Sequence, residues 1–394
     1  MSRQSQIALI KYGGFSHINS SVEVQLRRIY PECLLKVIDV KELLRKRPLM
    51  LLAGGISAIR WNGAMKLLRR CDPSDSIVQT PMVFRWLRHM IRKELSSGAY
   101  LFSLQTQSLW DGSTYGIPHF VYTDHTELAN MSYPAFDRYK LMGDFWIKLE
   151  REIYGNATRV FTMSEHVTRS LSTDYGVPDT RTECVYAGSN SNILALGRIP
   201  RRESVSAPVI LFVGVEWERK GGADLVAAFE RLKLKYSEVV LKIVGCSPRL
   251  TISGCEVVGK VSLEEMPAHY AEASIFCLPT RVEPFGIAFV EAMHAGLPIV
   301  GPDLGAVKDM VRNGENGYRV PPGDVDSIYQ ALDCLLEAPA QRIIEMGAAS
   351  RRIAREFYTW EAVGNRLKKA IDTAIAGTPK VSMVFGDADN IAAN

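Results

Sequence analysis

Two glutamates eight positions apart, Glu283 and Glu291, lie in the part of the sequence whose residue types best suit binding chemistry. Glu283 follows an apolar, strand-like run at 274–279. Glu291 lies in a helix-like run that stops at Gly296, with Pro298 shortly afterwards. Glycine after the last helical residue and proline just beyond are the usual signs of a helix end. We therefore expect Glu283 in a strand-to-helix loop and Glu291 inside the helix.

This strand-to-helix loop suits recognition of a hydroxyl-rich anion. In an open α/β sheet such a loop lies at the carboxyl edge, where ligands bind. The free N–H groups of a helix N-terminus attract phosphate, and Gly286 has no Cβ to keep the backbone away from it. Because a carboxylate accepts hydrogen bonds from neighbouring hydroxyls, Glu283 would hold a sugar and Glu291 a ribose. A chance pair of helical glutamates is the alternative that the spacing alone leaves open.

The residues around the two glutamates resemble the donor-site motif of retaining glycosyltransferase family 4, which has the two-domain GT-B fold. The resemblance rests on Pro-Phe-Gly at 284–286 and on the run from Glu291 to Pro298. Similar segments occur in order at 209–222, 239–245 and 313–324. The similarity is specific over about 208–330, weaker over 120–190 and faint before that. It implies an α/β protein with two Rossmann-like, doubly wound parallel-sheet domains facing across a cleft.

The resemblance also implies which residues bind the donor, a nucleoside diphosphate sugar. Phe285, Gly286 and Ile287 would offer their backbone to the diphosphate. His125, at the polar end of a predicted strand, would approach the sugar, with Asp124 as a less certain neighbour. The remaining positions are Gly13 and Gly14, in a turn that would face the diphosphate, and Ser164, at the tip of another predicted strand. A plain tight turn is the alternative for the two glycines.

Arg219 and Lys220 are two cations at the start of a predicted helix, where they oppose the helix dipole. An anion between them would remove that conflict, so they are expected to bind the diphosphate and stabilise it as it leaves. Two solvated surface cations are the alternative. The family usually has an arginine directly after the strand glycine, whereas Val215 follows Gly214 here. Either Arg219 replaces that charge, or Glu216 and Trp217 reshape the pocket.

A polar segment without periodicity marks the expected domain boundary. The N-terminal, acceptor-side domain is expected at 1–195 and the C-terminal, nucleotide-sugar domain at 205–358. The polar, aperiodic segment at 189–207 is the expected hinge. A helix at 359–376 would cross back to the first domain by family analogy, and 377–394 is an expected flexible tail.

Length and composition are those of a soluble two-domain protein. The chain has 394 residues, of which 47% are hydrophobic and 23% charged. No apolar stretch reaches the roughly 18–20 residues of a membrane span, and the apolar run at the start is too short for a secretory signal. The seven cysteines are scattered without Cys-x-x-Cys spacing, which suggests neither a zinc site nor a disulfide framework. We expect a cytoplasmic protein. Peripheral association with the inner face of a membrane is the alternative.

A basic surplus is concentrated near the N-terminus. Residues 1–110 contain 17 Lys and Arg against 7 Asp and Glu. Residues 84–93 form part of a predicted amphipathic helix with a basic face and an apolar face, which could lie on an anionic membrane surface. An ordinary surface helix with a solvated basic face is the slightly favoured alternative. No groove-reading or stacking motif appears, so nucleic acid is not an expected partner.

Neither a cofactor nor a metal is expected. Metal-dependent glycosyltransferases use an Asp-x-Asp within a sheet domain. The candidates here are Asp324–Asp326, where Asp324 reads as a helix N-cap, and Asp387–Asp389 in the tail. The resemblance implies metal-independent, retaining hexosyl transfer to a hydroxyl acceptor, such as a lipid, a lipid-linked intermediate or a saccharide of the polysaccharide or lipopolysaccharide type. The alternatives are another GT-B enzyme, either a phosphorylase or a sugar-nucleotide epimerase, and a catalytically silent GT-B binding protein.

Overall fold

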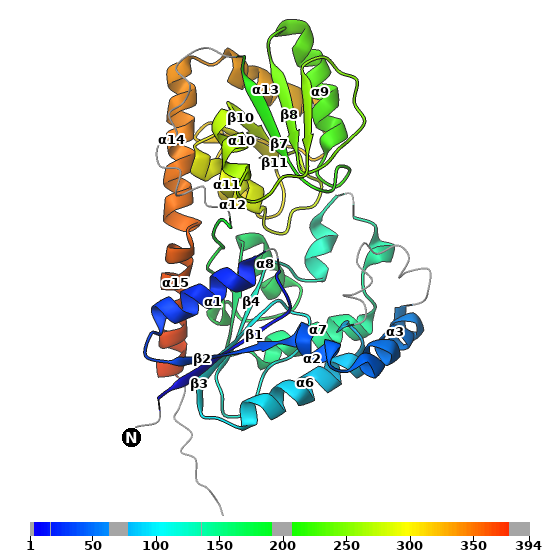
Figure 1. The fold of residues 1–394 in the computed structure, drawn as a ribbon, viewed down its shortest axis with the longest axis vertical. Helices are drawn as coiled ribbons and strands as arrows, with labels where there is room; N and C mark the ends of the chain where they lie inside the picture. The colour runs from blue at the N-terminus through cyan, green and yellow to red at the C-terminus, as the bar shows by residue number, and fades with distance from the viewer. Residues whose placement is uncertain (1–3, 16, 63–77, 135, 191–206, 378–394) are drawn as a thin grey trace, which may run out of the picture.

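Two parallel sheets of six strands form the framework of the chain (Figure 1). The structure is a computed structural model, and it describes residues 4–15, 17–62, 78–134, 136–190 and 207–377. Helices cover both sheets, which lie one above the other in Figure 1. Strands buried on both faces must be apolar throughout, which is why they could be recognised as short apolar runs between helix-like segments. The expected architecture of two doubly wound parallel sheets is confirmed.

The N-terminal lobe contains the sheet with strand order β2-β1-β3-β4-β5-β6. Its strands are β1 (Gln6–Lys11), β2 (Leu34–Asp39), β3 (Tyr100–Thr106), β4 (His119–Thr123), β5 (Arg159–Thr162) and β6 (Thr182–Cys184). Its helices are α1 (Ile18–Ile29), α2 (Val40–Arg45), α3 (Pro48–Asn62), α6 (Pro81–Ser96), α7 (Asp144–Asn156) and α8 (Glu165–Thr173). Short 3-10 turns occur at Leu128–Ser132, Arg138–Lys140 and Asp179–Arg181.

The C-terminal lobe contains the second sheet, with strand order β12-β11-β10-β7-β8-β9. Its strands are β7 (Val209–Val213), β8 (Val240–Val244), β9 (Cys255–Gly259), β10 (Ile275–Cys277), β11 (Ile299–Pro302) and β12 (Gly317–Val320). Its helices are α9 (Gly222–Lys235), α10 (Met266–Glu272), α11 (Ile287–Ala295), α12 (Val307–Met310), α13 (Val325–Glu337) and α14 (Ala340–Phe357). From β7 the chain builds the sheet in one direction, and from β10 in the other. The loops that follow these neighbouring strands therefore meet at a topological switch point.

The last helix, α15 (Trp360–Ala376), lies against α1 of the N-terminal lobe. Tyr30 Oη donates to Asp372 Oδ1 at 2.8 Å, and Arg28 Nη2 donates to Asn365 Oδ1 at 2.8 Å. In Figure 1, α14 and α15 run along one edge of the molecule and pass both lobes. Just before α15, the side chain of Tyr358 is buried and contacts Tyr186, with ring centroids 5.1 Å apart. This crossing therefore connects the lobes through hydrogen bonds and aromatic packing.

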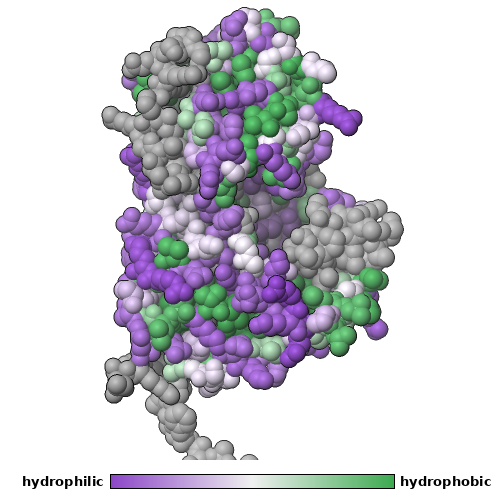
Figure 2. Space-filling view, viewed as in Figure 1, coloured by the Kyte–Doolittle hydropathy of each residue, from purple (hydrophilic) through white to green (hydrophobic). Residues whose placement is uncertain are grey.

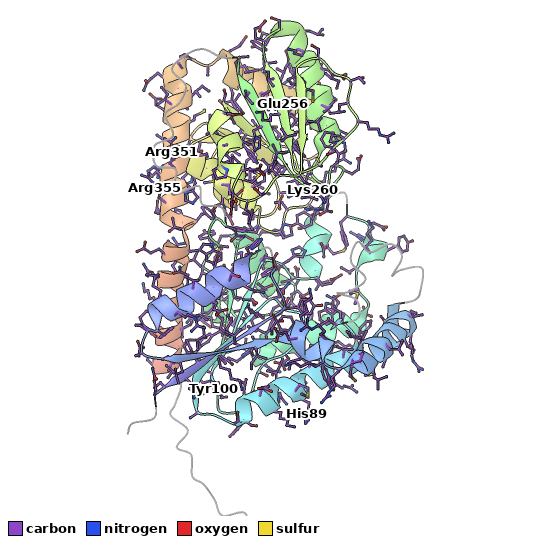
Figure 3. The ribbon with its side chains drawn as sticks, in the orientation of Figure 1. His89, Tyr100, Glu256, Lys260, Arg351 and Arg355 are labelled. Carbon is purple, nitrogen blue, oxygen red and sulfur yellow. The ribbon has the colours of Figure 1, made fainter. Side chains whose placement is uncertain are left out.

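Helix α6 contains the basic amphipathic segment, and its apolar face is buried. Phe84, Leu87, Ile91 and Leu95 are fully buried in the N-terminal lobe. On the other face Arg88 pairs with Asp111 and Glu152, and Figure 3 shows His89 at the outer edge of the lobe. The apolar face of residues 84–93 is therefore not available to a bilayer, whereas contact of their basic face with an anionic membrane surface stays a prediction. Periodicity revealed the apolar face, but the sheet of the same lobe covers it.

The predicted domain boundaries remain predictions. The first sheet ends with β6 at Cys184 and the second begins with β7 at Val209, whereas most of the expected hinge at 189–207 lies outside the described residues. The tail beyond 377 also lies outside them. Within the described part of the chain, no helix combines the length and the apolar character needed to cross a membrane.

Candidate functional site

An ion pair joins the two loops at the switch point of the C-terminal sheet. Lys220, after β7, and Glu283, after β10, place Nζ and Oε2 2.5 Å apart, with only 13% and 5% of their side chains exposed. The two residues are 63 positions apart in the sequence. They come together because β7 and β10 are adjacent strands. The pair lies at the carboxyl edge of the sheet, the place where open α/β sheets bind ligands.

The loop after β7 is fixed by backbone contacts. Gly221 has φ of 72°, and a Cβ at this position would lie 2.1 Å from the carbonyl oxygen of Pro279. Only glycine fits such a close approach in the left-handed region. The buried Thr280 adds a hydrogen bond from Oγ1 to the carbonyl oxygen of Arg219 at 3.2 Å. The Lys220 side chain is therefore presented from a rigid loop.

The Arg219 side chain is held within the same loop region. Its Nη1 donates to the carbonyl oxygen of Val282 at 2.8 Å, and its Nη2 pairs with Glu216 Oε1 at 2.8 Å. The hydrogen bond from Arg219 lowers the pKa of Glu216, so this carboxylate is charged at neutral pH. The two alternatives for this loop stay open, because a pair between Arg219 and Glu216 fits either of them. Through its hydrogen bond to Val282, Arg219 connects the loops after β7 and β10. This contact does not depend on whether Arg219 also binds an anion.

Helix α11 begins at the candidate anion site. Gly286 precedes it with φ of 96°, and a Cβ at Gly286 would lie 3.2 Å from Glu283 Cγ. Phe285 is buried, with its ring centroid 6.2 Å from that of Tyr358. Ile287 is the first residue of the helix, and the first turn of any helix leaves N–H groups without intrahelical acceptors. The expected end of the helix is confirmed, because Gly296 caps it with φ of 77°.

Glu291 lies within α11 and is 5% exposed. Its Oε2 accepts a hydrogen bond from the hydroxyl of Tyr270 in α10 at 2.9 Å. Burial and the neighbouring Glu291 raise the pKa of Tyr270, so this phenol remains a donor at neutral pH. Tyr270 therefore fixes the orientation of the Glu291 carboxylate.

Asp124, His125 and Tyr133 of the N-terminal lobe lie on the side of the site that faces Glu283. The His125 and Tyr133 rings stack with centroids 6.0 Å apart. A Cβ at Gly305 of the C-terminal lobe would lie 3.3 Å from Tyr133 Oη and 2.5 Å from the Glu283 carbonyl oxygen. Tyr133 therefore bridges from the N-terminal lobe to the segment that contains Glu283. Figure 2 shows the surface hollowed between the lobes on the face in view.

Burial controls the charges on this side of the site. Burial, together with the charge of Glu283, raises the pKa of Asp124 to about 6. It lowers the pKa of His125 to about 4, so the imidazole is neutral at pH 7. A neutral imidazole can both donate and accept a hydrogen bond, which suits a sugar hydroxyl.

Of the other expected site residues, Gly13 and Ser164 make hydrogen bonds within the N-terminal lobe. Gly13 has φ of 52°, and its N–H donates to Asp39 Oδ1 at 3.2 Å. Gly14, beside it, has open space where a Cβ would be. Ser164 is the N-cap of α8, and its Oγ accepts the N–H of Val167 at 3.3 Å. The Ser164 hydroxyl oxygen is therefore already used to cap α8. The position of Ser164 after a predicted strand did not indicate this capping role.

No metal site can be assembled from the described residues. Among them, no three His, Cys, Asp or Glu side chains converge in a way that could hold an ion. Asp324 is the N-cap of α13 and accepts the Ser327 N–H at 3.0 Å, in agreement with its interpretation as a cap. The pair Asp387–Asp389 lies outside the described residues.

Sequence reasoning missed Tyr133, Tyr270 and Thr280. Tyr133 lies in an irregular segment without periodicity, and Tyr270 reads as an ordinary core aromatic of a short helix. Thr280 directly follows the apolar run at 274–279, and its position in the sequence signals no role. Each of these side chains acts through a partner far away in the sequence, and no local pattern signals such a contact.

The resemblance to group 1 glycosyltransferases is confirmed for the C-terminal lobe. Residues 207–338 match the family model described as glycosyl transferases group 1. This range includes both loops of the switch point and all of α11. The Lys220–Glu283 pair therefore lies inside the part of the chain that matches the family model.

Curated mannosyltransferases are among the similar sequences. One is an MMP α-(1→4)-mannosyltransferase of Mycolicibacterium hassiacum, 27% identical over 59% of this chain and 58% of the relative. Another is a GDP-mannose-dependent α-(1-6)-phosphatidylinositol monomannoside mannosyltransferase of Mycolicibacterium smegmatis, 30% identical over 55% of this chain and 63% of the relative. The chain thus spans about three fifths of the length of these relatives.

Solved glycosyltransferase structures share the fold. A sucrose-phosphate synthase of Thermosynechococcus elongatus superposes with a TM-score of 0.68 at 17% identity, over 95% of this chain and 100% of that one. A glycosyltransferase of Rickettsia africae gives a TM-score of 0.65 at 12% identity, with the same two coverages. At such identities the likeness concerns the fold alone, and the fold is GT-B.

Proposed function

We propose that the protein is a retaining, metal-independent glycosyltransferase that moves a hexosyl group from a nucleoside diphosphate sugar to a hydroxyl of a lipid or lipid-linked acceptor. The observation that carries the proposal is the Lys220–Glu283 pair at the switch point, facing Asp124, His125 and Tyr133 of the other lobe. A cation, a helix N-terminus and hydroxyl-binding groups meet there, which is the set of groups that a sugar diphosphate requires.

In the proposed donor complex, Lys220 Nζ and the N–H groups at the start of α11 bind the diphosphate. Phe285, Gly286 and Ile287 supply the backbone of that turn. Glu291, oriented by Tyr270, accepts hydrogen bonds from the ribose hydroxyls. Glu283 and the neutral His125 bind the sugar. Lys220 would then exchange part of its contact with Glu283 for the diphosphate.

The proposed reaction depends on stabilisation of the leaving group. When the anomeric carbon–oxygen bond breaks, positive charge develops on the sugar and negative charge on the diphosphate. Lys220 and the helix dipole are already in place where the negative charge grows, so they stabilise the transition state more than the ground state. The acceptor hydroxyl attacks from the face that the diphosphate leaves, and its proton passes to the leaving phosphate oxygen. Neither a metal ion nor a protein base is required in this scheme.

The names of the relatives suggest which donor and acceptor to test first. One relative is named as GDP-mannose-dependent and as acting on a phosphatidylinositol monomannoside. GDP-mannose and a phosphoinositol mannoside are therefore the first pair to offer to this protein. UDP sugars are the second donor class, because solved relatives of this fold contain UDP.

The test is a transfer assay with GDP-mannose and phosphatidylinositol monomannoside in detergent, comparing the wild type with Glu283→Gln. We expect the substitution to lower turnover by about a hundredfold or more, since it removes a charged partner of the sugar and of Lys220. An α-configured product would support retention. Unchanged activity in a chelator would support metal independence.

The matched control is Glu183→Gln. Glu183 pairs with Arg159 at 2.7 Å in the other sheet and has no place in the site. It should leave turnover unaffected. Equal turnover of Glu283→Gln and wild type would remove Glu283 from the mechanism. If no sugar nucleotide of either class raises the melting temperature or is turned over, the proposed function itself is wrong.

A further inference from the structure

Helix α3 has a row of large apolar side chains on its outer face. Leu49, Leu52, Ile56 and Ile59 are 79%, 66%, 64% and 55% exposed. Their spacings of three, four and three residues place them on one face of the helix. Single exposed leucines are ordinary on protein surfaces, but four large apolar residues side by side usually mark an interaction site. We call these four residues the α3 stripe.

The inner face of α3 fixes the direction of the stripe. Ala58 is 2% exposed, and Leu51 packs against the core cluster that contains Leu44 and Leu87. The helix also contacts α2 and α6. In Figure 1, α3 lies at the outer end of the N-terminal lobe, away from α15, and Figure 2 shows green surface in that region. The α3 stripe is therefore held outward by packing on the opposite side of the helix.

Exposed cations lie at both ends of the α3 stripe. Arg45, Lys46 and Arg47 are exposed between α2 and α3, and Arg60 is exposed in the last turn of α3. They contribute to the surplus of 17 Lys and Arg over 7 Asp and Glu in residues 1–110. An apolar stripe with basic residues beside it matches an anionic bilayer, which offers acyl chains beneath negative headgroups.

We propose that the α3 stripe and its four cations dock the protein on the surface of an anionic lipid bilayer. The stripe enters the boundary between headgroups and acyl chains, and the cations contact lipid phosphates. A second copy of the chain is a poorer occupant, because two such faces would bring like charges together. This docking surface is separate from α6, whose apolar face is buried. The inference goes beyond the proposed function, because donor binding does not require it.

The test is co-sedimentation of the full-length protein with two kinds of vesicle. One kind is phosphatidylcholine alone, and the other an equal mixture of phosphatidylcholine and phosphatidylglycerol. We expect the wild type to bind the mixed vesicles at low salt and to be released as salt screens the cations. The double substitution Leu52→Ser and Ile56→Ser should weaken binding at least about tenfold, because two buried apolar side chains are lost. Replacing Arg45 and Arg47 by alanine should weaken binding only to the anionic vesicles.

The matched control replaces two exposed apolar residues of the C-terminal lobe, Leu234 and Ile344, by serine. These side chains are 91% and 51% exposed and have no place in the α3 stripe. This variant should sediment with vesicles like the wild type. Binding of GDP-mannose, measured by calorimetry without lipid, should be the same in the wild type and the Leu52/Ile56 variant. That readout separates failure of the docking surface from failure of the proposed function.

Four results would overturn the docking proposal. One is a wild type that stays in the supernatant with the mixed vesicles at low salt. The second is a Leu52/Ile56 variant that binds these vesicles as well as the wild type does. The third is a dimer in light scattering that the Leu52/Ile56 substitutions dissociate, since the occupant would then be another copy. The fourth is a marked fall in melting temperature for this variant, which would mean that the chain itself covers the stripe.

Discussion

At the scale of single residues, the site depends on a buried ion pair. Burying Lys220 and Glu283 has a desolvation cost, which their contact at 2.5 Å offsets. Removal of one partner leaves the other charge buried without compensation and typically costs about 3–5 kcal/mol of stability. Loss of function in a variant of this pair must therefore be separated from loss of folding.

Lys220→Ala should weaken binding of a nucleoside diphosphate. A hydrogen bond to a charged group contributes about 1.5–3 kcal/mol, so we expect about a tenfold to hundredfold loss in calorimetric affinity. Lys242→Ala is the matched control, because Lys242 is 10% exposed and pairs with Glu272 at 2.6 Å in the same lobe. This control should lose stability but keep the affinity of the wild type. Equal affinity of Lys220→Ala and wild type would mean that another cation binds the diphosphate.

At the scale of elements, the switch point works because the loops after β7 and β10 touch. The close approach of Gly221 to Pro279 brings the start of α9 against the end of β10. Arg219 and Thr280 add hydrogen bonds between the same two loops. The geometry of Lys220 relative to Glu283 therefore depends on a backbone contact that only glycine permits.

Gly221→Ala should be clearly more destabilising than Gly323→Ala. Both glycines have positive φ, 72° and 78°, so each alanine incurs about 1–2 kcal/mol of backbone strain. Only Gly221 has the Pro279 carbonyl in the way, because nothing lies within 4 Å of a Cβ at Gly323. Thermal unfolding should show the larger loss for Gly221→Ala, together with weaker nucleotide binding. Two variants of equal stability would show that the loop relaxes and that the contact is not rigid.

At the scale of the whole molecule, the lobes meet through a few specific contacts. Asp309 of α12 accepts the N–H of Glu165, at the start of α8, at 2.8 Å. Burial raises the pKa of Asp309 to about 6. A carboxyl of an unfolded chain has a pKa of about 4. Between these values the folded protein binds a proton that the unfolded chain has lost, so this group lowers the free energy of unfolding as pH rises.

Asp309→Asn should therefore gain stability relative to the wild type as pH rises from about 4 to about 7. Asparagine does not titrate, and its side-chain oxygen can still accept the Glu165 N–H. The difference between the two proteins should grow by on the order of 1–3 kcal/mol, measured by thermal unfolding in a series of buffers. Asp326→Asn, at an exposed aspartate of α13 that pairs with Arg231, controls for the loss of a surface carboxylate. A constant difference for Asp309→Asn would contradict the assigned pKa.

Much of the framework could be predicted from sequence because its signals are local. The apolar run before Glu283, the end of α11 at Gly296 and the cap at Asp324 each depend on residues a few positions apart. Strand burial and helix periodicity follow from the same short-range spacing. The placing of Glu283 in a strand-to-helix loop followed from these signals, whereas the two parallel sheets were implied by the resemblance to a known family.

The tertiary structure decided which side chains meet and which faces are covered. Lys220 contacts Glu283 only because β10 pairs with β7, and Tyr133 reaches Gly305 only because the lobes face each other. For α6, the sequence predicted an apolar face but did not decide what covers it. The sheet buries the apolar face of α6, whereas the packing of Ala58 leaves the α3 stripe exposed. Sequence periodicity shows that a helix has an apolar face, but only long-range packing determines whether another part of the chain covers that face.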